Sequence, residues 1–440
     1  MRVRTWWWAS AWFLTSMGWS GAAYAQAGQP PKVDPGDTAF VLLSAALVML
    51  MTPGLALFYG GMVRRKNALA TIMQSFICLA LVGVAWVVYG YSLAFGPDKG
   101  GLIGGLEWVG LRNVGLDPNP DYAPTIPHQA FMIYQAMFAV ITPALITGAF
   151  AERMKFKAYV VFVCLWSTLV YIPVAHWVWG AGGWLRTLGA LDFAGGTVVH
   201  ITSGVSALVA ALLIGKRLHY PSEDMRPHNV TITLCGTGLL WFGWFGFNAG
   251  SALSAGKLSV VAFVATNTAA AAAALAWMFL EWWDRGEPNV LGAASGAVAG
   301  LVGITPAAGF VSPMSAIVIG LGAGALCYLA VVKLRPMLGY DDSLDTFGIH
   351  GVGGVWGALA TGLFASKLVN ETGNNGLFAG NPAQVLIQLA GVAATVVYAV
   401  LISFVLLKAL DATMGLRVKE EAEEEGLDLS EHGQLAYDPL

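Results

Sequence analysis

The chain has 440 residues, of which 57% are hydrophobic and 11% are charged, and its mean hydropathy is +0.65. Soluble proteins carry roughly 25% charged residues, so this composition excludes a soluble protein and indicates a polytopic, all-α membrane protein. The formal net charge of −3 gives no indication of a nucleic-acid partner. The four cysteines lie in apolar runs without CxxC spacing, which argues against disulfides and a metal site.

The N-terminal segment has the pattern of a secretory signal. Arg2 and Arg4 precede an apolar stretch that begins at Trp6, and Ala23–Ala25 has the A-x-A form of a cleavage site. We predict that residues 1–25 are a cleaved signal peptide; the alternative is a twelfth membrane span. The mature chain then divides into a transmembrane domain, residues 26–410, and a cytoplasmic tail, residues 411–440.

Eleven apolar runs are each long enough to cross a bilayer, for which about 20 residues are needed. The predicted spans are 38–62, 68–94, 128–151, 158–180, 194–215, 229–250, 259–283, 290–309, 312–332, 347–366 and 383–409. If the mature N-terminus is outside, fifteen loop and tail lysines and arginines are inside and six are outside. Because positive charge is enriched on the cytoplasmic side, we predict an N-out, C-in orientation.

Two histidines lie within these apolar runs. His200 is near the middle of the run that follows Asp192, and His350 lies in the segment FGIHGVGG. A buried structural histidine is the common alternative for either one, but an ionisable side chain inside a membrane is a candidate functional residue.

The fifth and tenth spans are antiparallel, and each begins near an acidic cap candidate, Asp192 or Asp345. At 1.5 Å per residue, His200 lies about 12 Å from its cap and His350 about 7 Å from its own. The two side chains can therefore meet near the bilayer centre. This arrangement is typical of a 5+5 inverted repeat, here followed by an eleventh helix. Of the other histidines, we expect His176 to be interfacial and His128 to be solvated.

Three aromatic stretches stand out: residues 134–138, WFGWFGFNAGS at 241–251, and AHWVWGAGG at 175–183. Aromatic residues at helical spacing most often serve packing, but aromatic faces also bind cations, with about 1–2 kcal/mol once desolvated.

Together, DFAGGTVVHI, GWFGFNAGS, GAFAER and FGIHGVGG resemble the ammonium transporter (Amt/Mep/Rh) family, of the bacterial Amt type, from about residue 36 to the tail. The resemblance implies a transporter of ammonium in the bacterial inner membrane, a homotrimer with a pore in each subunit, and no cofactor. It implies that His200 and His350 line the pore as hydrogen-bonded twin histidines. Phe138 and Phe247 then form the outer gate.

The resemblance also implies an outer recruitment site, in which Ser251 supplies a hydroxyl and a tryptophan supplies a cation-binding face. We assign Trp179, with Trp177 and Trp184 as alternatives. Tyr134 stands where many bacterial members have phenylalanine, and it keeps the aromatic face. The resemblance implies that Asp192 supports the site structurally and electrostatically and does not contact the substrate directly. Helix capping is the role that the sequence itself offers in place of substrate contact.

Residues 411–440 include nine acidic positions, which is typical of a solvated, partly disordered tail. The resemblance implies instead that the tail packs on a neighbouring subunit and helps to bind a PII signalling protein.

Other functions remain open at this stage. No HExxH, G-x-S-x-G or phosphate-loop motif indicates an enzyme. A sensor that acts through a partner and an Rh-like facilitator of neutral ammonia are the two alternatives to electrogenic ammonium transport.

Overall fold

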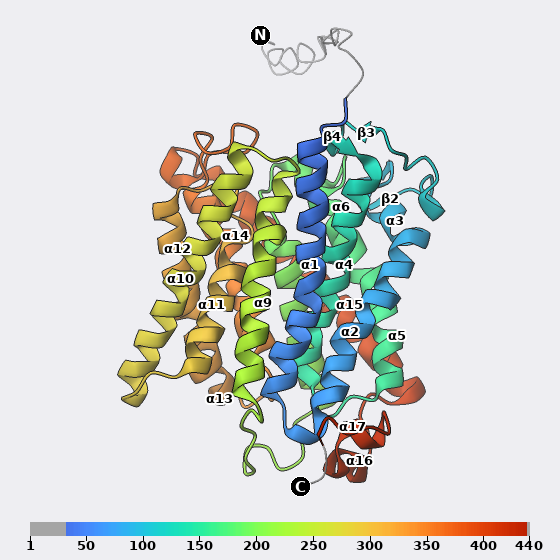
Figure 1. The fold of residues 1–440 in the computed structure, drawn as a ribbon, viewed down its shortest axis with the longest axis vertical. Coiled ribbons are helices and arrows are strands. Elements are labelled where there is room, and N and C mark those ends of the chain that lie inside the picture. The colour runs from blue at the N-terminus through green and yellow to red at the C-terminus, as the bar shows by residue number, and fades with distance from the viewer. Residues whose placement is uncertain (1–31, 438–440) are drawn as a thin grey trace, which may run out of the picture.

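The computed structural model describes residues 32–437, and the predicted signal peptide lies outside them. Helices run side by side along the long axis of the molecule (Figure 1). Ten helical runs among the described residues are long and apolar enough to cross a membrane. These are Pro35–Met62, Arg65–Phe95, His128–Phe150, Phe156–Leu188, Gly196–Ile214, Val230–Ala252, Lys257–Arg285, Pro313–Leu338, Phe347–Phe364 and Ala383–Met414.

Ten of the eleven predicted spans therefore coincide with such a run. The eighth predicted span, 290–309, is the apolar helix α11 (Val290–Ile304), which has 15 residues. This helix begins at Asn289, whose side chain accepts a hydrogen bond from Leu291 N. It ends at Thr305, directly before Pro306, which cannot donate a backbone hydrogen bond to continue it.

The ten runs contain fourteen α-helices. They are α1 (Pro35–Met62), α2 (Ala68–Ala85), α3 (Tyr91–Phe95), α4 (His128–Phe150), α5 (Phe156–Trp166), α6 (Ile172–Trp179), α7 (Trp184–Leu188), α8 (Thr202–Ile214), α9 (Val230–Ala249), α10 (Lys257–Arg285), α12 (Pro313–Leu329), α13 (Arg335–Leu338), α14 (Val352–Phe364) and α15 (Ala383–Met414). These runs also contain five π-helical turns. Three lie between α-helices: η2 (Trp86–Gly90), η4 (Ser167–Tyr171) and η7 (Ala330–Leu334). The other two begin their runs: η5 (Gly196–Ile201) and η8 (Phe347–Gly351). π-Helical turns are rare and are frequent at functional sites.

The packing of the helices follows a repeated pattern. α1 contacts α4 as α9 contacts α11, and α4 contacts α8 as α11 contacts α14. α1 and α9 lie side by side (Figure 1). The π-helical turns η5 and η8 contact each other, and η5 also packs on α14 and η8 on α8. Two contacts among α1, α4 and α8 thus have counterparts among α9, α11 and α14.

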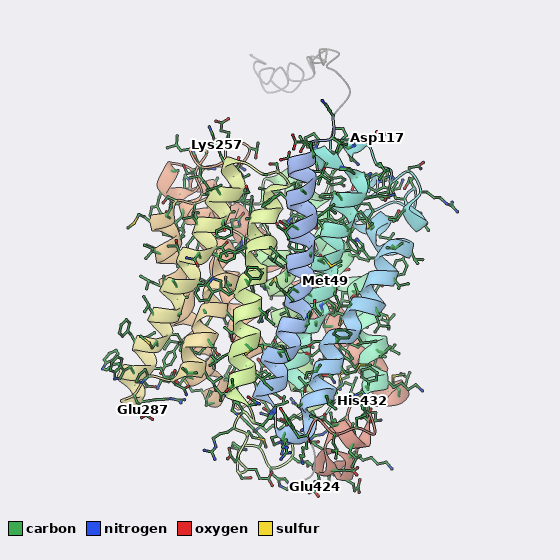
Figure 2. All side chains as sticks on the ribbon, viewed as in Figure 1. Met49, Asp117, Lys257, Glu287, Glu424 and His432 are labelled. Atoms are coloured by element: carbon green, nitrogen blue, oxygen red, sulfur yellow. The ribbon has the colours of Figure 1, made fainter. Side chains whose placement is uncertain are left out.

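Charged side chains gather at the two ends of the molecule. Lys257 and Asp117 lie at one end, and Glu287, Glu424 and His432 lie at the other, whereas Met49 lies in the apolar middle (Figure 2). Short strands, β1 (Asp98–Lys99) with β2 (Ile103–Gly104) and β3 (Pro118–Asn119) with β4 (Ala123–Pro127), cover the first end. The second end carries the tail helices α16 (Glu420–Glu425) and α17 (Leu427–Ser430).

Candidate functional site

The two histidines predicted to lie within spans come together in the middle of the bundle. His200 belongs to η5 and His350 to η8, and their Nδ1 atoms are 3.2 Å apart. The rings lie 5.3 Å apart between centroids at an angle of 21°, and both residues are at least 97% buried. At this separation a protonated Nδ1 of one ring can donate a hydrogen bond to an unprotonated Nδ1 of the other.

Glycines allow the two histidine helices to approach each other. A Cβ atom on Gly204 would lie 2.1 Å from the backbone nitrogen of Gly351. A Cβ atom on Gly354 would lie 3.0 Å from His200 Cβ. Each of these glycines stands four residues after one of the histidines, on the same face of its helix. Small residues at this spacing bring helix backbones together in a membrane, and here they set the distance between the imidazoles.

The histidine pair lines part of a narrow apolar cavity of about 10 Å³. This volume corresponds to about one water molecule. The lining consists of Met51, Leu55, Phe58, Ile141, Leu145, Val199, His200, Leu240, Trp244, Phe247, Val298 and His350. The two imidazoles and the indole nitrogen of Trp244 are the polar groups in this set, and Trp244 Nε1 donates to Thr305 Oγ1 over 2.9 Å. His200 Nε2 has no hydrogen-bond partner among residues 32–437.

Two phenylalanines separate this cavity from a second one. The rings of Phe138 and Phe247 lie 4.3 Å apart between centroids, and both residues are about 99% buried. Phe247 lines the narrow cavity, whereas Phe138 lines the second one. We call this second cavity the outer cavity, because it lies at the end of the molecule that is predicted to face outside. The ring pair therefore lies between the two cavities.

The outer cavity has a volume of about 190 Å³ and lies at the end that carries the short strands. Trp179, Ser251 and Phe138 all line it, and the Trp179 and Phe138 rings meet edge to face at 5.8 Å. Of the alternative tryptophans, Trp177 donates its Nε1 to Leu102 O, and the Trp177 and Trp184 rings pack against each other; neither lines the cavity. The geometry favours Trp179.

Tyr134 occupies a different place from the one its aromatic face led us to expect. The residue is fully buried and does not line the outer cavity. Its ring contacts Phe138 edge to face at 5.0 Å, and its hydroxyl lies 3.2 Å from Ser251 Oγ. Tyr134 thus lies behind the wall that Phe138 and Ser251 present.

Comparison with known proteins identifies relatives of this chain. The Ammonium Transporter Family matches residues 39–437 of the chain. The chain is 54% identical over 402 residues to an ammonium transporter of Bacillus subtilis (strain 168), which covers 91% of this chain and 98% of that relative. It is 50% identical over 421 residues to an ammonium transporter of Aquifex aeolicus (strain VF5), with 95% and 96% covered.

The chain belongs to the ammonium transporter family.

Solved structures of the family have the same fold. The crystal structure of Saccharomyces cerevisiae Mep2 superimposes with a TM-score of 0.84 at 41% identity, with 88% of each chain covered. A structure titled "Sensor Amt Protein" superimposes with a TM-score of 0.84 at 31% identity, covering 90% of this chain and 98% of that one. The present chain is thus a multi-pass membrane protein with the fold of these family members.

Asp192 caps the helix that carries His200. Its carboxylate accepts hydrogen bonds from Gly195 N and Gly196 N at 2.7 Å and from Thr197 N at 2.8 Å, and it also accepts the Thr197 hydroxyl. These are the backbone donors that a helix start leaves without intrahelical partners. Asp192 also lies beside the outer site, because its carbonyl accepts from Trp179 Nε1 over 2.9 Å. It does not line the outer cavity, so the structure favours the capping interpretation.

The cap of the second histidine helix is Asp342, and the prediction of Asp345 is wrong. Asp342 Oδ2 accepts from Phe347 N over 2.7 Å, whereas the Asp345 carboxylate pairs with Arg335. Asp192 and Asp342 each precede their histidine by eight residues, so the two caps are equivalent. Burial raises the pKa of Asp342 to about 7.

The residues that line the outer cavity but were not predicted as site residues include Gln135 and Arg186. Gln135 lines the cavity, and its Oε1 has no hydrogen-bond partner among the described residues. Arg186 also lines it, and its Nη1 donates to Trp179 O over 2.8 Å. Gln135 stood in the aromatic stretch at 134–138, but nothing in the sequence distinguished it from an ordinary helix surface residue.

The other end of the bundle has a cavity of about 340 Å³, and its lining includes Ser343, Leu344 and Asp345 shortly before η8. Arg217 and Asp345 line it, and Arg217 forms a salt bridge of 2.9 Å with Asp341. Nearby, Arg153 of the GAFAER segment is fully buried and donates to the carbonyls of Ala149, Ala151, Gly215 and Asp341 and to Ser343 Oγ. This arginine joins the ends of the helices at this side.

The tail is packed against this end, so the interpretation of a wholly solvated tail is wrong. Asp428 Oδ1 accepts from Ala70 N over 2.8 Å at the start of α2, and Leu427 N donates to Asn67 Oδ1 over 2.8 Å. Glu423 Oε1 accepts from Leu218 N over 2.7 Å. Two acidic side chains of the tail, Glu423 and Asp428, therefore bind backbone donors of their own chain.

Proposed function

We propose that this protein moves ammonium across the bacterial inner membrane, from the outer cavity through the histidine pair to the cytoplasm. The observation on which this rests is the pair His200 and His350, joined at 3.2 Å and lining an apolar cavity next to the Phe138–Phe247 ring pair. The family membership supports the substrate.

The outer cavity binds the ammonium cation. Trp179 and Phe138 offer aromatic faces, which attract a cation through their quadrupoles. Ser251 Oγ supplies a hydrogen-bond acceptor, which ammonium needs because it has four donors and no lone pair. The cavity is also wide enough, at about 190 Å³, for a cation with part of its water shell.

The narrow cavity excludes the intact cation. A bare ion in a medium of low dielectric constant faces a Born cost of tens of kcal/mol, whereas neutral ammonia loses only its hydrogen bonds to water. Ammonium therefore loses a proton at the phenylalanine pair, and ammonia passes below it. Potassium is similar in size to ammonium but has no proton to lose, so the same step rejects it.

The proton follows through the imidazoles, which makes transport electrogenic. Each neutral imidazole has one donor and one acceptor nitrogen, so a joined pair can accept a proton on one side and release one on the other. His200 Nε2 has no partner among the described residues, which leaves a nitrogen free for ammonia or a proton.

We also propose an eleven-span topology with the N-terminus outside, in which α11 completes the eighth crossing. The equivalent caps Asp192 and Asp342, eight residues before their histidines, support two inverted halves followed by α15. In the same proposal residues 1–25 are a signal peptide, the protein is a homotrimer, and the cytoplasmic end with its tail binds a PII-type protein. The ordered tail helices, α16 and α17, support a regulatory surface there.

A sensor of ammonium is the second candidate, because a structure titled "Sensor Amt Protein" has the same fold. A sensor needs only the outer site, whereas a transporter needs the whole path.

Currents from purified protein in liposomes, adsorbed on a solid-supported membrane, distinguish these functions. We expect an ammonium pulse to produce an inward charge movement and a potassium pulse of equal ionic strength to produce none. Ammonium binding without current, but with ammonia-dependent alkalinisation of the lumen, would establish a neutral facilitator. Binding with neither signal would establish a sensor.

A further inference from the structure

We propose that Tyr134 is a positioning residue of the outer site. Its hydroxyl holds the Ser251 hydroxyl so that a lone pair of Ser251 Oγ faces the cation, although Tyr134 itself does not touch the cation. This inference rests on the proposed binding of ammonium in the outer cavity.

The Tyr134 hydroxyl lies within a set of acceptors behind the cavity wall. Its oxygen is 2.9 Å from Gly246 O, 2.9 Å from Phe247 O and 3.2 Å from Ser251 Oγ. A tyrosine has one hydroxyl proton, and carbonyl oxygens only accept. Because two carbonyl oxygens at the end of α9 lie closer to the Tyr134 oxygen than Ser251 Oγ does, we place the Tyr134 proton on a carbonyl, which leaves the tyrosine oxygen as an acceptor toward Ser251.

Ser251 also has one proton, and the wall offers two acceptors for it. Ser251 Oγ is 2.9 Å from Phe247 O, and the second acceptor is the Tyr134 oxygen. With its proton held in the wall, Ser251 presents a lone pair to the cavity that it lines. The hydroxyl is thus an acceptor in the direction of the ligand, as a donor-only cation requires.

The approach of Tyr134 depends on the glycine next to Ser251. A Cβ atom on Gly250 would lie 2.7 Å from the Tyr134 oxygen, closer than real Cβ contacts. Gly250 begins the short turn Gly250–Ala252 that ends α9, so the chain places Ser251 directly against the tyrosine. In a Tyr134→Phe protein, Ser251 keeps one wall partner and gains freedom to rotate away from the cavity.

A double-mutant cycle tests the inference, with ammonium-evoked currents measured over a range of concentrations for wild type, Tyr134→Phe, Ser251→Ala and the double variant. We expect Tyr134→Phe to raise the half-saturating concentration about fivefold, as the loss of one net hydrogen bond predicts, and to leave the maximal current within about twofold. In the Ser251→Ala background, Tyr134→Phe should have no further effect. Additive effects of the two changes, or an unchanged half-saturating concentration in Tyr134→Phe, would overturn the inference.

Tyr122 provides the matched control. It lines the same cavity, but its hydroxyl donates to Phe95 O over 2.6 Å and accepts from Ala181 N over 3.0 Å, away from Ser251. The effect of Tyr122→Phe should therefore be the same with and without Ser251→Ala. If wild type gives no ammonium signal, the proposed function fails; if wild type transports and the cycle shows no coupling, only the role of Tyr134 fails.

Discussion

At the scale of single residues, the outer site shows why residue type alone does not assign a role. The sequence does not distinguish the roles of Trp177, Trp179 and Trp184. Of the three, only Trp179 lines the outer cavity beside Phe138 and Ser251. Tyr134 and Gln135 are neighbours on α4, and their places are the reverse of what their chemistry suggests. The aromatic residue lies behind the wall, and the amide lines the cavity.

Replacing Trp179 by leucine should weaken ammonium binding. The indole face contributes about 1–2 kcal/mol to cation binding, so we expect the half-saturating ammonium concentration to rise about 5- to 30-fold. Trp179→Phe should restore part of the affinity because it keeps an aromatic face. Trp177→Leu is the control, since that ring packs against Tyr398 and Trp184. Equal effects of Trp177→Leu and Trp179→Leu on the concentration dependence would show that the site is elsewhere.

At the scale of elements, the two histidine helices are built in the same way. Each begins with an aspartate cap, carries its histidine in a π-helical turn eight residues later, and has a glycine four residues after that. The sequence motif identified Asp192 but placed the second cap at Asp345, three residues too late. Only the folded chain shows that Arg335 takes up the Asp345 carboxylate and leaves Asp342 to the helix.

The buried cap Asp342 makes stability depend on pH. Burial raises its pKa to about 7, above the value of about 3.9 that an aspartate has in an unfolded chain. The stabilisation that the protonated form provides is therefore complete below about pH 4 and is lost as the pH rises through about 7. We expect Asp342→Asn, which keeps an acceptor for Phe347 N but cannot ionise, to abolish this dependence. Thermal unfolding in detergent from pH 5 to pH 8.5 measures it, and an identical pH dependence in wild type and variant would contradict the assignment.

At the scale of the whole molecule, hydropathy predicted most of the architecture. Ten of the eleven predicted spans coincide with long apolar helices, because a segment that crosses lipid must satisfy its backbone internally. The twin histidines could also be found, since an ionisable residue in an apolar run is exceptional. Their meeting at 3.2 Å was only permitted by the spacing, and it depends on the contacts of Gly204 and Gly354.

Features that depend on packing between distant segments could not be predicted. His128 was expected in solvent, but it is buried and its Nε2 bonds the Tyr91 hydroxyl. His176, predicted at the membrane interface, is buried in the protein, and its ring nitrogens bond Ala94 O and Asp98 Oδ1.

The charge of the tail predicted that it is solvated. In the structure, Asp428 and Glu423 accept hydrogen bonds from backbone donors that are hundreds of residues away in the chain. Amino-acid composition does not show which distant residues form hydrogen bonds with each other.

The most direct test of transport through the histidine pair is the ammonium-evoked current of a His200→Ala/His350→Ala double variant, measured beside wild type in liposomes of the same composition. We predict that the variant still binds ammonium at the outer site but loses the selective current, either entirely or by admitting potassium, because the proton is no longer separated from ammonia. A double variant that keeps a wild-type ammonium current and still rejects potassium would contradict transport through the histidine pair.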